Sequence, residues 1–189
     1  MDRTLIIIPK MFNQEEFRML TGIIPDDFEK TSKEFWDYIE EKLVPLIHTI
    51  KRVYCIVPLE IITKHIKSSE NGEYLIFRKL IENNSELIYV EDKLLVSEVE
   101  GWLEMMKTTK TAGVIELYED SVKERNNYII KKIDQTLKVG EIGVMITNLN
   151  HKLPLPEDIR LIKMCRFNPE DYLTRWVTKL ELEKQVSKE

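Results

Sequence analysis

Residues 5–8, Leu-Ile-Ile-Ile, form an uninterrupted apolar run that ends at Pro9 and is followed at once by Lys10. A strand whose two faces are both covered by helices is apolar at every position, whereas a strand with one face in water alternates between apolar and polar residues. The run therefore predicts a buried strand of a parallel sheet, which places the chain in the α/β class.

Four further apolar and β-branched runs have the length of strands, namely residues 53–57, 87–90, 143–147 and 159–164. Longer segments with helical spacing separate most of them. Short strands that alternate with helices are typical of βαβ units, in which neighbouring strands run parallel. We therefore predict a single three-layer α/β/α domain over residues 1–189, with a mainly parallel sheet of about five strands.

The helical segments carry apolar side chains at steps of three and four residues, which marks the face that packs on a core. They are expected near residues 31–43, 60–67, 74–82, 95–106 and 116–137, and from Pro169 onward. In the long segment 116–137, Asn126 falls on the apolar face with Val122 and Ile129. A buried amide needs a partner, so we expect Asn126 to make a structural hydrogen bond to a neighbouring strand.

Composition limits the class of partner. The chain is 43% hydrophobic and 32% charged, as in an ordinary globular protein. Its net charge of −5, with basic residues interleaved among acids, argues against a nucleic-acid-binding surface. The longest apolar run, residues 5–9, is far shorter than the roughly 20 residues that a membrane span needs. We therefore expect neither a nucleic acid nor a membrane as partner.

The cysteines and the N-terminal residues indicate a cytoplasmic protein. Cys55 and Cys165 lie in apolar segments and form no CxxC pair, so we interpret them as buried free thiols in a reducing compartment. No basic region precedes the first apolar run, so we expect no secretion signal. The motifs GxGxxG, GxxxxGKS/T, GxSxG and HExxH are all absent, and the sequence assigns no cofactor.

Polar residues that follow the predicted strands form the candidate site, because open parallel sheets bind ligands beyond the carboxyl ends of their strands. They are Lys10, Asn13, Glu15 and Glu16 after the first strand, Glu60 after the second, Glu91 and Asp92 after the third, and Asn148, Asn150 and His151 after the fourth. Carboxylates and an imidazole suit a hard metal ion or general acid–base chemistry. The same acids also fit a structural reading, in which Glu91 and Asp92 cap the helix that follows.

Several stretches also resemble a known family. They are FWDYIEEKL at residues 35–43, VEDKLLVSEVEGWLEMM at 90–106, KERNNYIIKKIDQTLKVGE at 123–141, GVMITN at 143–148 and the histidine that closes NLNH at 148–151. Together they resemble a group of uncharacterised prokaryotic proteins that is distantly similar to the TraB/PrgY and ChaN-type superfamily. That superfamily includes pheromone-shutdown proteins, haem-binding lipoproteins, erythromycin esterases and a metal-dependent protease. The strongest local match is the ERN stretch at residues 124–126, which precedes a strand and a turn similar to GxxH.

The resemblance implies a metal-assisted hydrolase in which His151 is a ligand or base. Glu91, Asp92 and Glu15 would be the acids, and substrate contacts would come from Arg125, Asn148, Asn150 and Lys10. The sequence departs from the family pattern at Asn148, where a glycine is expected, at Phe12, where a histidine is expected, and at Ile56, where an acid is expected.

Because two of the expected ligands are missing, we expect a catalytically degenerate binding or regulatory module, with a diverged hydrolase as the alternative. Its partner would be a small molecule or a protein, and homo-oligomerisation through the C-terminal helix is a further hypothesis.

Overall fold

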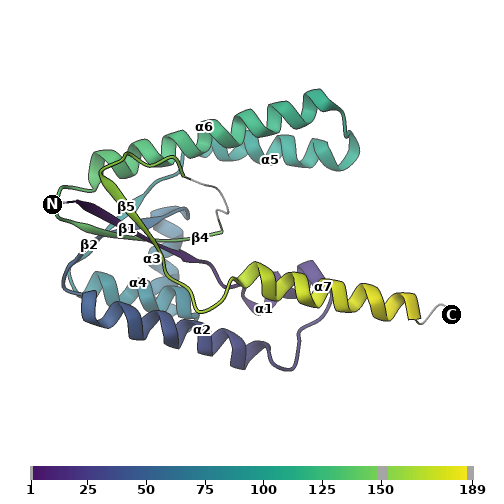
Figure 1. Ribbon diagram of the computed structural model, residues 1–189, viewed down its shortest axis with the longest axis horizontal. Helices are drawn as coiled ribbons and strands as arrows, with labels where there is room; N and C mark the ends of the chain where they lie inside the picture. Colours follow the sequence, from purple (N-terminus) through teal and green to yellow (C-terminus); the bar gives the residue numbers. More distant parts are fainter. Residues whose placement is uncertain (1, 149–152, 187–189) are drawn as a thin grey trace.

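The computed structural model describes residues 2–148 and 153–186, with side chains up to Leu182. Its centre is a sheet of five parallel strands in the order β3-β2-β4-β1-β5 (Figure 1). The strands are β1 (Arg3–Pro9), β2 (Ile50–Cys55), β3 (Glu86–Tyr89), β4 (Ile142–Thr147) and β5 (Ile159–Lys163). The predicted α/β class and parallel sheet are confirmed.

Helices cover both faces of the sheet. They are α1 (Gln14–Thr21), α2 (Phe28–Leu43), α3 (Leu59–Ser68), α4 (Gly72–Glu82), α5 (Lys93–Thr108), α6 (Ala112–Thr136) and α7 (Pro169–Val186), with a 3-10 turn at Val44–Leu46. α2 and α4 lie on one face and α6 lies on the other (Figure 1). Successive residues of β4 therefore enter different cores: Val144 and Ile146 pack with α2 and α4, whereas Met145 packs with α6. None of the described helices is long and apolar enough to cross a membrane.

The connections between strands define a switch point at the carboxyl edge of the sheet. The chain leaves β1 through α1 and α2, passes over β4 on the α2 face, and returns as β2. It leaves β4 in the opposite direction to reach β5, and Leu155 of that connection packs into the core on the α6 side. Neighbouring strands β1 and β4 thus send their connections to opposite faces, the arrangement at which open α/β sheets hold ligands.

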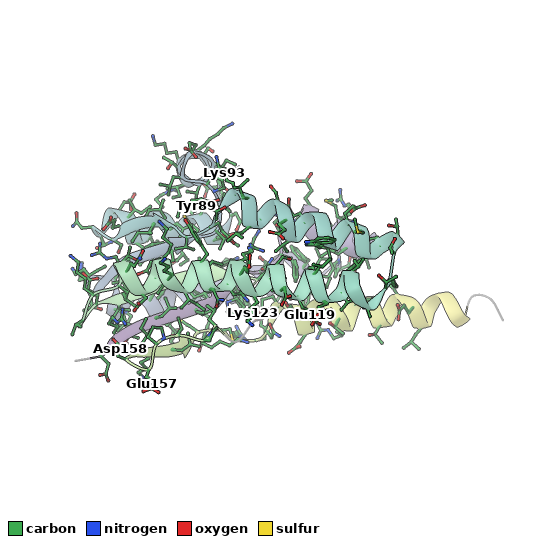
Figure 2. The ribbon with its side chains drawn as sticks, turned by 90° about the horizontal axis from the view of Figure 1, so that it is seen from above. Tyr89, Lys93, Glu119, Lys123, Glu157 and Asp158 are labelled. Carbon is green, nitrogen blue, oxygen red and sulfur yellow. The ribbon has the colours of Figure 1, made fainter. Side chains whose placement is uncertain are left out.

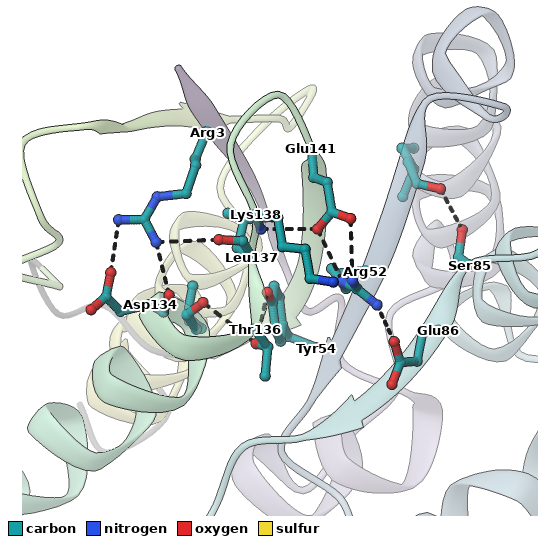
Figure 3. A network of polar contacts seen from close by, with 12 residues as sticks. Arg3, Arg52, Tyr54, Ser85, Glu86, Asp134, Thr136, Leu137, Lys138 and Glu141 are labelled. Atoms are coloured by element: carbon teal, nitrogen blue, oxygen red, sulfur yellow. Dashed lines mark hydrogen bonds and ion pairs between the residues drawn. The ribbon is translucent and has the colours of Figure 1, made fainter. Parts of the chain in front are cut away.

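Arginines fix the opposite, amino edge of the sheet (Figure 3). Arg3 donates from Nη1 to the carbonyl oxygens of Asp134 and Leu137, at 2.8 and 3.2 Å, and so satisfies carbonyls at the end of α6. Arg52 of β2 pairs with Glu141, just before β4, at 3.1 Å, and with Glu86 of β3. These contacts join three strands and a helix at the edge that faces away from the candidate site.

The pair α5 and α6 extends well past the sheet as an arm (Figure 1). The 25 residues of α6 span about 37 Å, whereas the six of β4 span about 20 Å. Figure 2 shows Glu119 on the half of α6 that extends away from the sheet. Within the arm Val99 is buried against α6, while Leu103 and Met105 are exposed.

Three local predictions differ from the structure. The residues after Asn13 form α1, which was not among the predicted helices. Cys55 is buried as predicted, but Cys165 is only partly buried, and both thiols are free. Asn126 is 8% exposed, yet its Oδ1 has no hydrogen-bond partner among the described residues, so the expected bond to a strand is missing there.

Candidate functional site

Lys10 stands at the switch point, directly after β1. Its backbone N–H donates to the carbonyl oxygen of Thr147 at 3.1 Å, which keeps β1 and β4 paired to their ends. Its ammonium nitrogen lies 2.7 Å from Glu16 Oε1 and 4.0 Å from Glu73 Oε2. Lys10, Glu16 and Glu73, here called the Lys10 cluster, join β1, α1 and α4 at the carboxyl edge.

Local sequence places both acids of the Lys10 cluster. The Asn13 side chain accepts from the backbone N–H of Glu16, and the Glu16 carboxylate accepts from the backbone N–H of Asn13, which is a capping box. Glu73 lies in the first turn of α4, where the side chain of the N-cap Asn71 accepts from its N–H at 3.0 Å. The helix starts therefore hold both carboxylates toward the lysine.

Glu73 is the buried member of the cluster, with 6% of the residue exposed. Burial raises its pKa to about 7, against the lowering effect of Lys10 and with a smaller raising effect of Glu16. Burial lowers the pKa of Lys10, but attraction to Glu73 and the hydrogen bond that Lys10 donates to Glu16 outweigh it, so the net shift is upward. Lys10 therefore stays an ammonium ion, and Glu73 is the group that exchanges a proton near neutral pH.

Replacing Glu73 by Gln tests this burial. The folded-state pKa of about 7 lies above the ordinary 4.5, so between these values the folded protein holds a proton that the unfolded chain releases. The free energy of unfolding contributed by Glu73 therefore falls as pH rises through that window. We expect Glu73→Gln to be more stable than the native protein at pH 8 by about 1–3 kcal/mol, with little difference at pH 5. Urea unfolding at both pH values measures this difference in the free energy of unfolding.

Glu15→Gln, at an exposed position, is the control. If the stability of the native protein and of Glu73→Gln changed equally with pH, the raised pKa of a buried Glu73 would be contradicted.

A cleft of about 420 Å³ adjoins the Lys10 cluster. Its lining comes from residues 12–14 at the start of α1, from α2 between Phe28 and Asp37, and from residues 70–72 and Leu75 at the start of α4. It shares Asn13 with the capping box of Glu16, and Gly72 precedes Glu73 in the chain. We call it the strand-end cleft, because the starts of α1 and α4 lie at the carboxyl edge of the sheet.

One wall of the strand-end cleft depends on a glycine. A Cβ atom at Gly72 would lie 2.1 Å from Trp36 Cγ and 2.7 Å from Trp36 Cβ. Gly72 therefore allows the start of α4 to lie directly on the Trp36 ring of α2. The indole is 8% exposed, so the contact holds it as a fixed wall.

Two of the predicted site residues bind each other on the α6 face. Arg125 Nε donates to both carboxylate oxygens of Glu91, at 3.0 and 2.9 Å, and Arg125 Nη2 also donates to Glu91. The Glu91 side chain is 0% exposed and that of Arg125 is 21% exposed. The hydrogen bonds that Arg125 donates to Glu91 raise the pKa of Arg125, against the opposing effect of burial. The pair thus ties α6 to the segment after β3.

The other predicted residues are not brought into one site. Asp92 is the N-cap of α5 and accepts from the backbone N–H groups of Leu94 and Leu95, at 2.8 and 3.3 Å. Glu15 is exposed, and its neighbour Glu16 contacts Lys10 instead. Asn148 is exposed after β4, whereas Asn150 and His151 lie outside the described residues. Within residues 2–148 and 153–186, no group of three His, Cys, Asp or Glu side chains is placed to hold a metal ion.

Sequence reasoning named Glu16 among the residues after the first strand but assigned the role to Glu15, and it missed Glu73, although a signal for Glu73 existed. Glu73 precedes Ile76, Phe77 and Leu80 at helical spacing, so an acid occupies the stripe that enters the core.

The resemblance to the TraB/PrgY and ChaN-type superfamily stays a prediction. Comparison with protein-family models, with curated proteins and with solved structures finds no match for this chain.

Proposed function

We propose that the protein is a binding module, and that its ligand is a small molecule held in the strand-end cleft. The observation that carries this proposal is the cleft itself, which is lined by the starts of α1 and α4, the two helices that also supply the acids of the Lys10 cluster. Small-molecule sites of α/β sheets occur at this place, and their volumes are typically about 300–1,000 Å³.

The lining of the strand-end cleft also suits a small molecule. Phe12, Phe28, Trp36 and Leu75 supply apolar surface. Asn13, Ser32 and Asn71 supply hydrogen-bonding groups, and both asparagines are fixed by their roles as helix caps. A mostly apolar wall with a few fixed polar groups is the usual composition of a ligand pocket.

The roles of the strand-end acids favour binding over hydrolysis. Glu91 is neutralised by Arg125, and Asp92 caps α5, so two of the three acids of the expected hydrolase site have structural partners. A metal-assisted hydrolase would have to recruit other acids. Metal bound in near-stoichiometric amount by the purified protein, and lost in Glu91→Gln, would favour the hydrolase.

Blocking the cleft tests the proposal. Ser32 lines it from α2, and Ser32→Trp would fill much of its volume. We expect small molecules found by ligand-observed NMR screening to bind Ser32→Trp at least tenfold more weakly than the native protein. Ser97→Trp adds the same side chain at an exposed position of α5, across the sheet, and should leave binding unchanged. Ligands that bind both variants with native affinity would contradict the proposed site.

A further inference from the structure

The charges around the strand-end cleft indicate the class of its ligand. We infer that the cleft takes an organic cation, such as an alkylammonium or quaternary ammonium group; this rests on the proposed function and specifies its ligand. Glu29, Asp37 and Glu70 line the cleft against a single lysine, Lys33. The lining therefore carries an excess of two negative charges.

The pairing within the lining leaves two acids, Glu29 and Glu70, without a neutralising cation among the described residues. Lys33 Nζ lies 2.6 Å from Asp37 Oδ2, so these two charges offset each other. Gln14 Nε2 donates to Glu29 Oε1 at 2.8 Å, which holds that carboxylate in place without neutralising it. Glu70 is exposed at the cleft and has no ion-pair partner among the described residues. A cation in the cleft would meet Glu29 and Glu70 without having to displace a lysine.

The aromatic rings act in the same direction as the acids. Phe12, Phe28 and Trp36 all contribute to the lining. The face of an aromatic ring carries partial negative charge and attracts a cation, and this attraction is strongest for tryptophan and for weakly hydrated quaternary ammonium groups. Trp36 cannot rotate away, because Gly72 lies against its Cγ.

Helix dipoles at the cleft would favour an anion, but the chain already offsets them. The starts of α1, α2 and α4 all contribute to the lining, and each presents positive partial charge. Glu16, Glu29 and Glu73 stand in the first turns of these three helices. The Asn13 and Asn71 side chains accept from N–H groups that an anion would use. Carboxylates therefore already offset the positive partial charge of the three helix starts, and an anionic ligand in the cleft would face one of them, Glu29.

Choline and 3,3-dimethylbutan-1-ol have nearly the same shape, but only choline carries a positive charge. Comparing their affinities therefore tests the contribution of charge. We expect choline to bind at least tenfold more tightly, with amide shifts in ¹⁵N spectra around Ser32 and Leu75. Glu70→Gln should weaken choline binding about threefold to tenfold and leave binding of the neutral analogue unchanged. Glu119→Gln, on the arm, is the matched control and should change neither.

Each of the following results would overturn one part of the inference about the ligand. Equal affinity for the two probes in the cleft would overturn the cation and leave the binding module standing. Inorganic phosphate that binds at Ser32 and Leu75 while choline does not would replace the cation with an anion. Choline shifts located away from the cleft, or no shift by any of the three probes at millimolar concentration, would overturn the inferred ligand class. The proposed function is tested separately, and it fails if the ligands found by screening bind Ser32→Trp with native affinity.

Discussion

Arg125→Ala is expected to lower the free energy of unfolding by about 3–5 kcal/mol, because it leaves the fully buried Glu91 carboxylate without its partner. The carboxylate would lose every hydrogen bond that Arg125 donates to it. In a domain of this size such a loss lowers the melting temperature by roughly 10 °C. Urea unfolding monitored by circular dichroism measures the effect.

Two further variants decide whether the loss comes from an unpaired charge. The double variant Glu91→Leu/Arg125→Leu removes both charges and should recover much of the lost stability, since buried ion pairs can often be replaced by apolar residues. Lys107→Ala removes an exposed pair with Glu104 on α5 and should cost no more than about 0.5 kcal/mol. A small effect of Arg125→Ala, similar to that of Lys107→Ala, would show that water reaches Glu91.

Gly72→Ala is expected to destabilise the protein by about 2–3 kcal/mol through overpacking against Trp36. Part of the clash is with Trp36 Cβ, which is fixed to the α2 backbone, so rotation of the indole cannot relieve it. α4 must move away from α2, and the wall of the strand-end cleft moves with it. Urea unfolding measures the stability, and near-UV circular dichroism reports the surroundings of the indole.

Gly101→Ala is the control for Gly72→Ala, and we expect it to change stability in the opposite direction. Gly101 lies inside α5, and a Cβ atom there would meet no atom within 4 Å. Alanine should therefore stabilise the helix by about 0.5–1 kcal/mol. If both variants were destabilised equally, the cause would be the general response to alanine and not the Trp36 contact.

The fold was predictable because strands β1 and β4 inside the sheet are mostly buried on both faces. The run at residues 5–8 could be recognised from composition alone, since no polar residue interrupts it. The start of β2 was not recognised: Lys51 and Arg52 lie inside that strand, where charge normally argues against burial. Arg52 is tolerated there because Glu86 and Glu141 pair with it across two neighbouring strands. That reason exists only after the strands are assembled.

The sequence indicated the edge of the sheet at which the strand-end cleft lies, but not which side chains contact each other there. The rule on strand ends selected Lys10, and it offered Glu15 and Glu16 alike. We assigned the role to Glu15, because only the helical phase of α1 decides which acid faces the lysine, and that helix was not predicted. Glu73 lies 63 positions after Lys10, and its approach depends on how α4 packs, which local patterns do not contain. The cleft has the same origin, since three separate helix starts form it.

The position of β4 between β1 and β2 has a consequence for the order in which the chain can fold. β1 pairs only with β4 and β5 among the described strands, so its edges stay open until residues 142–147 exist. During synthesis, β2 and β3 can already pair with each other while residues 5–8 of β1 still have no partner strand. Contacts between such distant positions slow folding and prolong the exposure of apolar strand edges. A nascent chain that ends before residue 142 therefore displays its most apolar segment without a partner, which makes it a substrate for chaperones until the central strand arrives.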